Sequence, residues 1–216
     1  MYTYINKYID LLNFCDETQL CELYSAQYPE KIQQQYKSIR KYVKKALKSD
    51  LSDIDKYYLS KEAYGFWVAV LSDDTSDKDA QVQEGKIIGM IGVQENKSWF
   101  DHNSQNDKLH KAEIVRLGVH ESHRKCGVGT ALLQHLLAFC KSCKYDLIVA
   151  TTMNVLPDAI AFYETNGFER LHTELCASAT QSHPPSSYPC HKGDNSTYSL
   201  QFLRYALKID SKLIRD

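Results

Sequence analysis

The most informative pattern of apolar and polar positions lies between residues 113 and 167. An apolar run at 114–119 is followed by a polar turn and by a segment with two glycines, Gly127 and Gly129. Beyond the second glycine, apolar residues recur every three or four positions, as on the buried face of an α-helix. These residues are Leu132, Leu133, Leu136, Leu137 and Cys140. The pattern predicts a strand, a glycine-containing loop and a helix in succession.

Similar periodicities divide the rest of the chain into strands, helices and polar loops. Strands are predicted at 2–9, 66–71, 86–93, 113–119, 147–151, 168–175 and 198–209. Helices are predicted to begin near Asp16, at Pro29, after Gly129 and at Pro157, and polar loops are predicted at 72–84, 97–110 and 183–195. The predicted fold is α/β (α+β), a single domain over residues 1–216. Its mixed sheet has about seven strands, with helices on both faces.

Composition narrows the functional classes. The chain has 216 residues, with 43% hydrophobic and 25% charged residues, which are values of a globular domain. A net charge of −1 argues against general binding to nucleic acid. No apolar run approaches about 20 residues, and the first residues lack a secretory signal pattern, so we expect no membrane segment. The odd number of cysteines, 7, favours free thiols in a reducing compartment, with the cytoplasm expected and the nucleus not excluded.

The glycine-containing loop has the chemistry of an anion site. Consecutive backbone N–H groups before a helix can converge on a phosphate, and the positive end of the helix dipole adds to their attraction. A dinucleotide-binding fingerprint would need a third glycine where the chain has Leu132. A P-loop would end in Gly-Lys-Ser/Thr, whereas this loop ends in Gly129-Thr130-Ala131. Neither nucleotide-binding motif therefore describes the segment.

The sequence from Arg124 to Gly129 instead fits Arg/Gln-x-x-Gly-x-Gly/Ala. With Ala112-Glu113-Ile114-Val115 before it and Ala161-Phe162-Tyr163-Glu164-Thr165-Asn166-Gly167-Phe168 after it, the segment resembles the GNAT superfamily of N-acetyltransferases. The similarity is to the histone-type and camello-type branches and covers an acetyl-CoA-binding core at about 85–172. It implies the GNAT fold, in which a parallel central pair, here 113–119 and 147–151, splays apart to admit acetyl-CoA.

The resemblance also implies which groups hold that co-substrate. The backbone of Leu117, Gly118 and Val119 would pair with the pantetheine arm, and the N–H of Val119 would donate to the thioester oxygen. The pyrophosphate would be held by the backbone N–H groups of Lys125, Cys126, Gly127, Val128, Gly129 and Thr130. Arg124 and Lys125 would add positive charge, whereas the thiol of Cys126 would have no role.

Two residues are candidates for catalysis. A tyrosine is protonated at neutral pH and can donate to a departing thiolate, so Tyr163 is the candidate general acid. The alternative for Tyr163 is packing beside Phe162. Glu113 is the candidate base for the incoming amine if burial raises its pKa. Its alternative is an ordinary polar residue at a strand start, in which case His120 or a water chain would be the base.

Other chemistry-bearing residues have structural explanations that we favour. Arg116 is charged within an apolar strand, and pairing with an internal carboxylate is favoured over contact with an acidic substrate. His120 and His123 are expected in a surface turn. Asn154 is similar to a cofactor-contacting Asn of the family, although the family position falls at Leu156. A zinc site built on Cys140-x-x-Cys143 with Cys176, Cys190, His183 and His191 is disfavoured by spacing, so no metal is expected.

The function that the resemblance implies is transfer of an acetyl group from acetyl-CoA to a primary amine by direct attack in a ternary complex. A small molecule or amino acid is the favoured acceptor. A protein-lysine or N-terminal acetyltransferase and a non-catalytic acyl-CoA-binding regulator are the alternatives. The family frames the acceptor with regions 16–48 and 176–197, and a homodimer is possible. The basic face of the helix at 30–48 is expected to be solvated, with attraction for acidic substrates or phosphates as the alternative.

Overall fold

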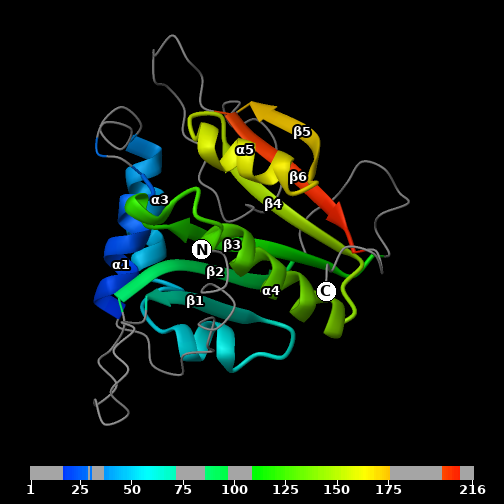
Figure 1. The fold of residues 1–216 in the computed structure, drawn as a ribbon, viewed down its shortest axis with the longest axis horizontal. Coiled ribbons are helices and arrows are strands. Elements are labelled where there is room, and N and C mark those ends of the chain that lie inside the picture. The colour runs from blue at the N-terminus through cyan, green and yellow to red at the C-terminus, as the bar shows by residue number, and fades with distance from the viewer. Residues whose placement is uncertain are drawn as a thin grey trace, which may run out of the picture.

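The computed structural model describes residues 17–28, 30, 37–71, 86–96, 109–175 and 201–209. The predicted strand at 2–9 and the three predicted polar loops lie wholly or mostly outside these ranges. Within them, one sheet of six strands forms the centre of the molecule (Figure 1). These six strands correspond to six of the seven that the sequence predicts, and the seventh, at 2–9, lies outside the described residues.

The six strands include both of the strand pairs that the sequence predicts. They are β1 (Gly65–Leu71), β2 (Lys86–Glu95), β3 (Lys111–Val119), β4 (Leu147–Met153), β5 (Glu169–Leu175) and β6 (Gln201–Lys208). Their order across the sheet is β1-β2-β3-β4-β6-β5. The hairpin of β1 and β2 is antiparallel, as predicted. Among the described strands only β3 and β4 run parallel, because α4 connects them across one face of the sheet.

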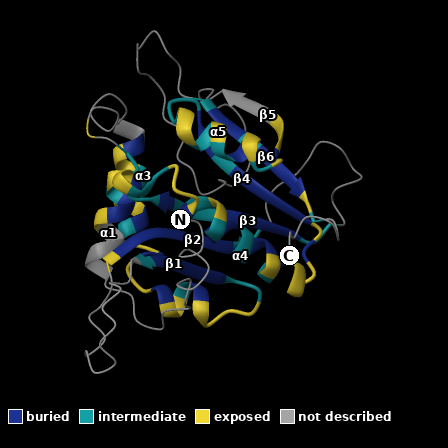
Figure 2. Cartoon of the chain, in the orientation of Figure 1, coloured by how far each residue is buried: buried dark blue, intermediate teal, exposed yellow. Residues whose placement is uncertain are grey.

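Helices cover both faces of the sheet, as the sequence predicts (Figure 1). The helix α4 (Val128–Ser142) packs on one face with α5 (Pro157–Thr165). On the other face lie α1 (Glu17–Ala26), α3 (Lys37–Leu47) and a short π-helix, η2 (Asp55–Leu59). Figure 2 shows the buried sides of these helices turned to the sheet and exposed positions turned to solvent. No described helix is both long and apolar enough to cross a bilayer.

The apolar stripes identified in the sequence become the two cores. On α4 the buried residues are Val128, Leu132, Leu133, Leu136, Leu137 and Cys140. On α3, Ile39, Val43 and Ala46 are buried and Leu47 is partly buried. Burial of each large side chain contributes about 1.5–3 kcal/mol. The cores therefore fix both helix layers against the sheet.

The parallel pair opens partway along its length. β3 and β4 are in register only from Lys111 beside Leu147 to Ile114 beside Ala150. Beyond that point β3 continues to Val119 and β4 to Met153 without pairing with each other. We call this gap the split. The splayed parallel pair expected from the sequence is confirmed.

A β-bulge in β3 begins where the split begins. Val115 is opposite Gly92 and Gly118 is opposite Met90, so two residues of β3, Arg116 and Leu117, face one residue of β2. Arg116 has φ of 56°, a left-handed conformation that costs a non-glycine residue about 1–2 kcal/mol. A bulge bends its strand and increases its twist, which turns β3 away from β4.

The side chain of Arg116 compensates for this backbone conformation. Its Nε and Nη2 donate to the two carboxylate oxygens of Asp50 at 2.7 Å each. Its Nη1 donates to the hydroxyls of Tyr24 at 2.7 Å and Tyr42 at 2.9 Å. Asp50 also accepts from Tyr58 at 2.6 Å. The prediction that Arg116 pairs with an internal carboxylate is confirmed, and the pair ties the bulge to α1 and α3.

Replacing Asp50 with alanine should destabilise the fold by about 3–5 kcal/mol, because it leaves the guanidinium of Arg116, whose side chain is only 12% exposed, without its counter-charge. The measurement is urea unfolding, with Glu62→Ala at an exposed turn as the matched control. A loss below about 1 kcal/mol, the value of a surface pair, would contradict this role.

The contribution of Asp50 should also depend on pH. Burial alone would raise its pKa, but the hydrogen bonds and charge of Arg116 hold the pKa below its ordinary value. The stabilisation should therefore be present above about pH 4, the unfolded pKa, and be lost as pH falls through the lower folded pKa.

Candidate active site

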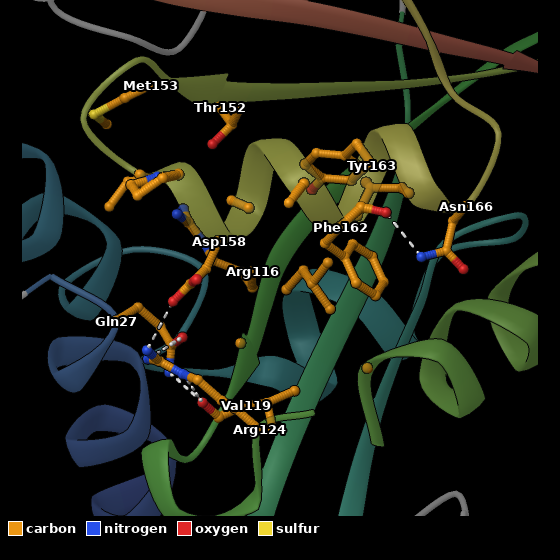
Figure 3. Close-up of a pocket in the computed structure, with 18 of the residues that line it drawn as sticks. Gln27, Arg116, Val119, Arg124, Thr152, Met153, Asp158, Phe162, Tyr163 and Asn166 are labelled. Carbon is orange, nitrogen blue, oxygen red and sulfur yellow. Dashed lines mark hydrogen bonds and ion pairs between the residues drawn. The ribbon is translucent and has the colours of Figure 1, made fainter. Parts of the chain in front are cut away.

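A cleft of about 530 Å³ occupies the split. One side is formed by β3 and by the loop that precedes α4, and the other by the end of β4 and by α5 (Figure 3). Residues of α1 and α3 close one end. The volume falls in the range of small-molecule sites, and the cleft lies where two parallel strands part. The bulge at Arg116 thus creates the space, and the helices supply its walls.

The loop before α4 presents a run of unengaged backbone donors. None of the N–H groups of residues 125–130 donates a hydrogen bond to any described residue. On either side of the run the amides are engaged: Arg124 donates to the carbonyl of Glu121 at 3.3 Å, and Ala131 donates to that of Gly127 at 2.9 Å. We call residues 125–130 the amide loop.

Backbone conformation explains how the amide loop turns. Lys125 has φ of 59° and Gly127, the N-cap of α4, has φ of 86°. Left-handed residues that alternate with right-handed ones direct successive N–H groups to one side, which is a common way to bind anions. The 15-residue helix that follows adds the positive end of its dipole. The arrangement is suited to a phosphate or pyrophosphate.

Close packing explains one of the glycines. A Cβ atom on Gly129 would lie 3.1 Å from Cε2 of Phe162, a side chain of α5 on the far side of the cleft. A side chain at this position would therefore need Phe162 to shift by a few tenths of an ångström, so glycine favours the close approach of α4 to α5. Of the predicted loop residues, five line the cleft: Arg124, Lys125, Gly127, Gly129 and Thr130. Cys126 is exposed and Val128 is buried in the core, and neither lines the cleft.

The edge of β3 also offers backbone groups to the cleft. Leu117, Gly118 and Val119, all predicted from the sequence, line it. His120 N–H donates to the carbonyl of Ile88 at 2.8 Å. Hydrogen-bonded and non-bonded pairs alternate in an antiparallel ladder, so Val119, the preceding residue, directs its N–H and C=O away from β2. The N–H of Val119 therefore points to the side on which the split lies.

Arg124 spans the mouth of the cleft (Figure 3). Its Nε donates to the carbonyl of Val119 at 3.2 Å, and its Nη1 lies 3.7 Å from a carboxylate oxygen of Asp158 on α5. Gln27, just after α1, donates to the same carbonyl of Val119 at 3.4 Å. The guanidinium thus contacts protein groups. The sequence had predicted only that it adds positive charge near the phosphates.

Tyr163 lies in the wall of the cleft that α5 forms (Figure 3). Its ring is 5% exposed and stacks on Tyr205, with centroids 5.6 Å apart. Burial, with smaller contributions from Tyr42 and Glu113, raises the pKa of its hydroxyl well above the ordinary value. No described residue makes a hydrogen bond to this hydroxyl. Tyr163 is accordingly both a packing residue and a protonated donor at the cleft.

Glu113 occupies the paired part of β3, just before the split. Its carboxylate is 8% exposed and accepts a hydrogen bond from Nε2 of Gln94 at 3.1 Å. Burial raises its pKa, although Gln94 and the charge of Arg204 partly oppose the shift. Ile114 lines the cleft but Glu113 does not. Its carboxylate can therefore reach a group in the cleft only through an intervening molecule such as water.

Three tyrosines form a wall that the sequence did not single out as part of a site. Tyr24 of α1, Tyr28 just after it, and Tyr42 of α3 all line the cleft. Their rings contact one another edge to face, with centroids 5.6 Å apart for Tyr24 and Tyr28 and 6.2 Å for Tyr28 and Tyr42. We call these residues the tyrosine wall. The available signal was the high tyrosine count, 15, together with a charged Arg116 in the strand opposite.

The remaining sequence candidates have structural positions. Asn154 does not line the cleft, and its Oδ1 accepts from the backbone N–H of Gln201 at 3.0 Å. His120 and His123 flank Ser122, whose hydroxyl lies 2.8 Å from Nδ1 of each ring, in the predicted turn. Cys140 is buried in the core. Cys143, the C-cap of α4, is partly buried. Among the described residues no group of three or more His, Cys, Asp or Glu could hold a metal, and Cys176, His183, Cys190 and His191 lie outside them.

This geometry agrees with comparisons to known proteins. A family model described as "Acetyltransferase (GNAT) family" matches residues 18–168, and the chain belongs to this family of acyltransferases. N-acetyltransferase 8 of Rattus norvegicus is 31% identical over 131 residues, which is 61% of this chain and 51% of that protein. N-acetylaspartate synthetase of Xenopus tropicalis is 30% identical over 135 residues, 62% of this chain and 42% of that protein. The chain thus spans about half the length of these relatives.

Solved structures agree on the fold. A GNAT-family acetyltransferase of Staphylococcus aureus Mu50 aligns with a TM-score of 0.55 at 21% identity, covering 94% of this chain and 99% of that one. A chain of the NatC complex bound to Gag peptide and CoA aligns with a TM-score of 0.52 at 16% identity, covering 94% and 97%. The GNAT fold predicted from the sequence is confirmed.

Replacing Gly127 with alanine should weaken the binding of inorganic pyrophosphate about fivefold. A left-handed residue other than glycine costs about 1 kcal/mol, which the loop can avoid by turning its amides away. Isothermal titration calorimetry measures the affinity. Gly167→Ala is the matched control, because Gly167 has a similar φ of 83° but lies outside the cleft. Equal affinities of both variants would show that the amide loop does not hold the anion.

Proposed function

We propose that the chain transfers the acetyl group of acetyl-CoA to a primary amine. The observation that carries this proposal is the run of six unengaged N–H groups at 125–130, placed beside the split. A diphosphate has several acceptor oxygens and two negative charges, and a run of N–H donors at a helix N-terminus satisfies both. Calorimetry with acetyl-CoA tests binding, and release of free thiol on addition of amines tests transfer.

In this proposal the chain's own groups hold and polarise the thioester. The amide loop would bind the diphosphate, and the unpaired edge of Leu117, Gly118 and Val119 would pair with an extended pantetheine arm as an added strand does. The N–H of Val119 would donate to the thioester oxygen, where negative charge develops during attack. The bound thioester supplies the acetyl group. Attack by the amine nitrogen on its carbonyl carbon forms the C–N bond and then breaks the C–S bond.

Glu113 is proposed to remove the proton of the incoming ammonium through water. Its buried carboxylate has a raised pKa, which brings it nearer to the working pH of a base. Because Glu113 does not line the cleft, direct contact with the amine is not part of the proposal. The hydrogen bond from Gln94 would orient the carboxylate oxygens.

Tyr163 is proposed to serve as the acid by donating a hydrogen bond from its hydroxyl to the departing sulfur. The raised pKa keeps the phenol protonated at every working pH. A thiol has a pKa near 8.5, well below that of this phenol, so the thiolate would be stabilised mainly by a short O–H hydrogen bond. Bulk water would complete the protonation after release. The ring stacking on Tyr205 fixes the direction of the hydroxyl.

The names of relatives and structural neighbours point to different molecules as the recipient of the acetyl group. The name of one relative, N-acetylaspartate synthetase, suggests a small acidic amino acid, whereas the NatC neighbour is bound to a peptide. A small amine is the acceptor that we propose, with a protein-lysine or N-terminal acetyltransferase as the alternative. The three free cysteines in the described part of the chain fit a reducing compartment such as the cytoplasm.

Replacing Tyr163 with phenylalanine should lower kcat about 10-fold or more, because the thiolate loses its donor while the ring still packs. The dissociation constant for acetyl-CoA should change little. Steady-state kinetics and calorimetry give the two values. Tyr205→Phe, which removes a hydroxyl from the stacked neighbour, is the control and should keep its kcat. An unchanged kcat in Tyr163→Phe would remove this residue from the mechanism.

Replacing Glu113 with glutamine should abolish the acidic limb of the pH–rate profile. In the unaltered enzyme, kcat/KM should fall as pH drops through the raised pKa of Glu113, because a protonated carboxyl cannot accept a proton. The profile of a Glu95→Gln control, on the neighbouring strand β2, should keep the limb. If the limb persists in Glu113→Gln, another group such as His120 is the base.

A further inference from the structure

The end of the cleft that faces α1 and α3 is built almost wholly from aromatic and apolar side chains. The tyrosine wall belongs to one packed cluster with residues from the turn after β4 and from β6. The members of that cluster that line the cleft beside the tyrosines are Val115, Met153, Val155, Leu156 and Phe202. A ligand in this end would therefore exchange water for ring faces and aliphatic carbon.

The charged side chain at this end of the cleft is already hydrogen-bonded within the protein. Arg116 is the one described cationic residue there, and its Nε and both Nη atoms donate to Asp50, Tyr24 and Tyr42 at 2.7–2.9 Å. Asp50, with which it pairs, is 4% exposed and has further hydrogen bonds from Tyr58 and Ser49. No donor remains on the guanidinium in position to clamp a carboxylate bidentately, as Arg does when it recognises one.

The other Asp, Lys and Arg residues that line the cleft belong to the amide loop and to the pair at its mouth, where Arg124 also donates to Oε1 of Gln27 at 3.5 Å. Lys125 is in the amide loop, and Arg124 and Asp158 pair across the mouth. The described lining beside the tyrosine wall therefore provides ring faces and hydroxyls. It provides no charged side chain that lacks a protein partner. Burying an unpaired carboxylate there would cost several kcal/mol, whereas an ammonium group over tyrosine rings gains about 0.5–2 kcal/mol.

We propose that the acceptor is a primary amine on an aromatic or extended apolar group, without a carboxylate beside the amine. Arylalkylamines are the chemical class that meets this description. The inference rests on the proposed acetyl transfer and specifies its acceptor. The apolar group would lie against Tyr28, Met153 and Phe202, and the amine would reach toward Tyr163 between the tyrosine wall and α5. Free aspartate would be a poor acceptor on the same grounds.

The test compares amines that differ in one group. Thiol release is followed at saturating acetyl-CoA with 2-phenylethylamine, with phenylalanine, which adds a carboxylate beside the amine, and with aspartate. A peptide with one lysine is the fourth arm. The kcat/KM for 2-phenylethylamine should exceed each of the others at least about 10-fold, a difference of about 1.4 kcal/mol. Equal or faster transfer to phenylalanine, aspartate or the peptide would overturn the assignment.

A pair of variants locates the apolar group. Tyr28→Ala should raise the KM for 2-phenylethylamine about fivefold or more by removing a ring from the wall, while the KM for acetyl-CoA stays within about twofold. Tyr64→Ala is the matched control, because Tyr64 packs on the same cluster and does not line the cleft. If both variants raise the KM equally, the wall does not contact the acceptor and the assignment fails.

The outcomes separate this inference from the proposed function. Acetyl-CoA binding without transfer to any amine would refute acetyl transfer, and the acceptor assignment would fall with it. Transfer confined to carboxylate-bearing amines would keep acetyl transfer and refute only the acceptor class. Calorimetry of acetyl-CoA binding, measured on the same preparation, distinguishes these cases because it does not depend on the acceptor.

Discussion

The bidentate pair between Arg116 and Asp50 is the interaction on which the rest of the site depends. It holds Arg116 in a left-handed conformation in the middle of β3, and that bulge coincides with the end of pairing between β3 and β4. The same guanidinium binds the hydroxyls of Tyr24 and Tyr42. One buried cation therefore sets the shape of the strand edge and the position of the opposite wall. A buried ion pair is weak evidence for stability, but it is well suited to fixing one arrangement.

The two sides of the cleft are supported by different helix layers. The amide loop depends on α4, whose buried stripe packs on one face of the sheet. The tyrosine wall depends on α1 and α3, which pack on the other face. The two parts meet at β3, where Arg116 reaches one face and Val119 presents its backbone to the split, and at Gln27, whose Oε1 accepts from Arg124 at 3.5 Å. Changes in the α1–α3 layer can therefore alter what the wall accepts while the loop before α4 stays intact.

The sequence predicted most of the fold because the relevant signals are local. The periodicity of α4, the hairpin of β1 and β2, and the two glycines of the loop can each be identified within about 30 residues. The sequence indicated that Arg116 pairs with a carboxylate. It did not indicate which one, because Asp50 lies 66 positions away. The tyrosine wall was missed for a related reason. Tyr24 and Tyr42 each look like ordinary members of amphipathic helices until the two helices are placed beside β3.

The contact between Arg124 and Asp158 bridges the mouth of the cleft. Nη1 of Arg124 and Oδ2 of Asp158 are 3.7 Å apart, and the side chain of Asp158 is 74% exposed to solvent. Such an exposed pair holds at most about 1 kcal/mol and is screened by physiological salt. The Arg124 side chain can therefore leave Asp158 at little cost while α5 keeps its packing on the sheet. The mouth is thus held by a contact that salt weakens, whereas the side chains of Arg116 and Asp50, 12% and 5% exposed, are shielded from solvent.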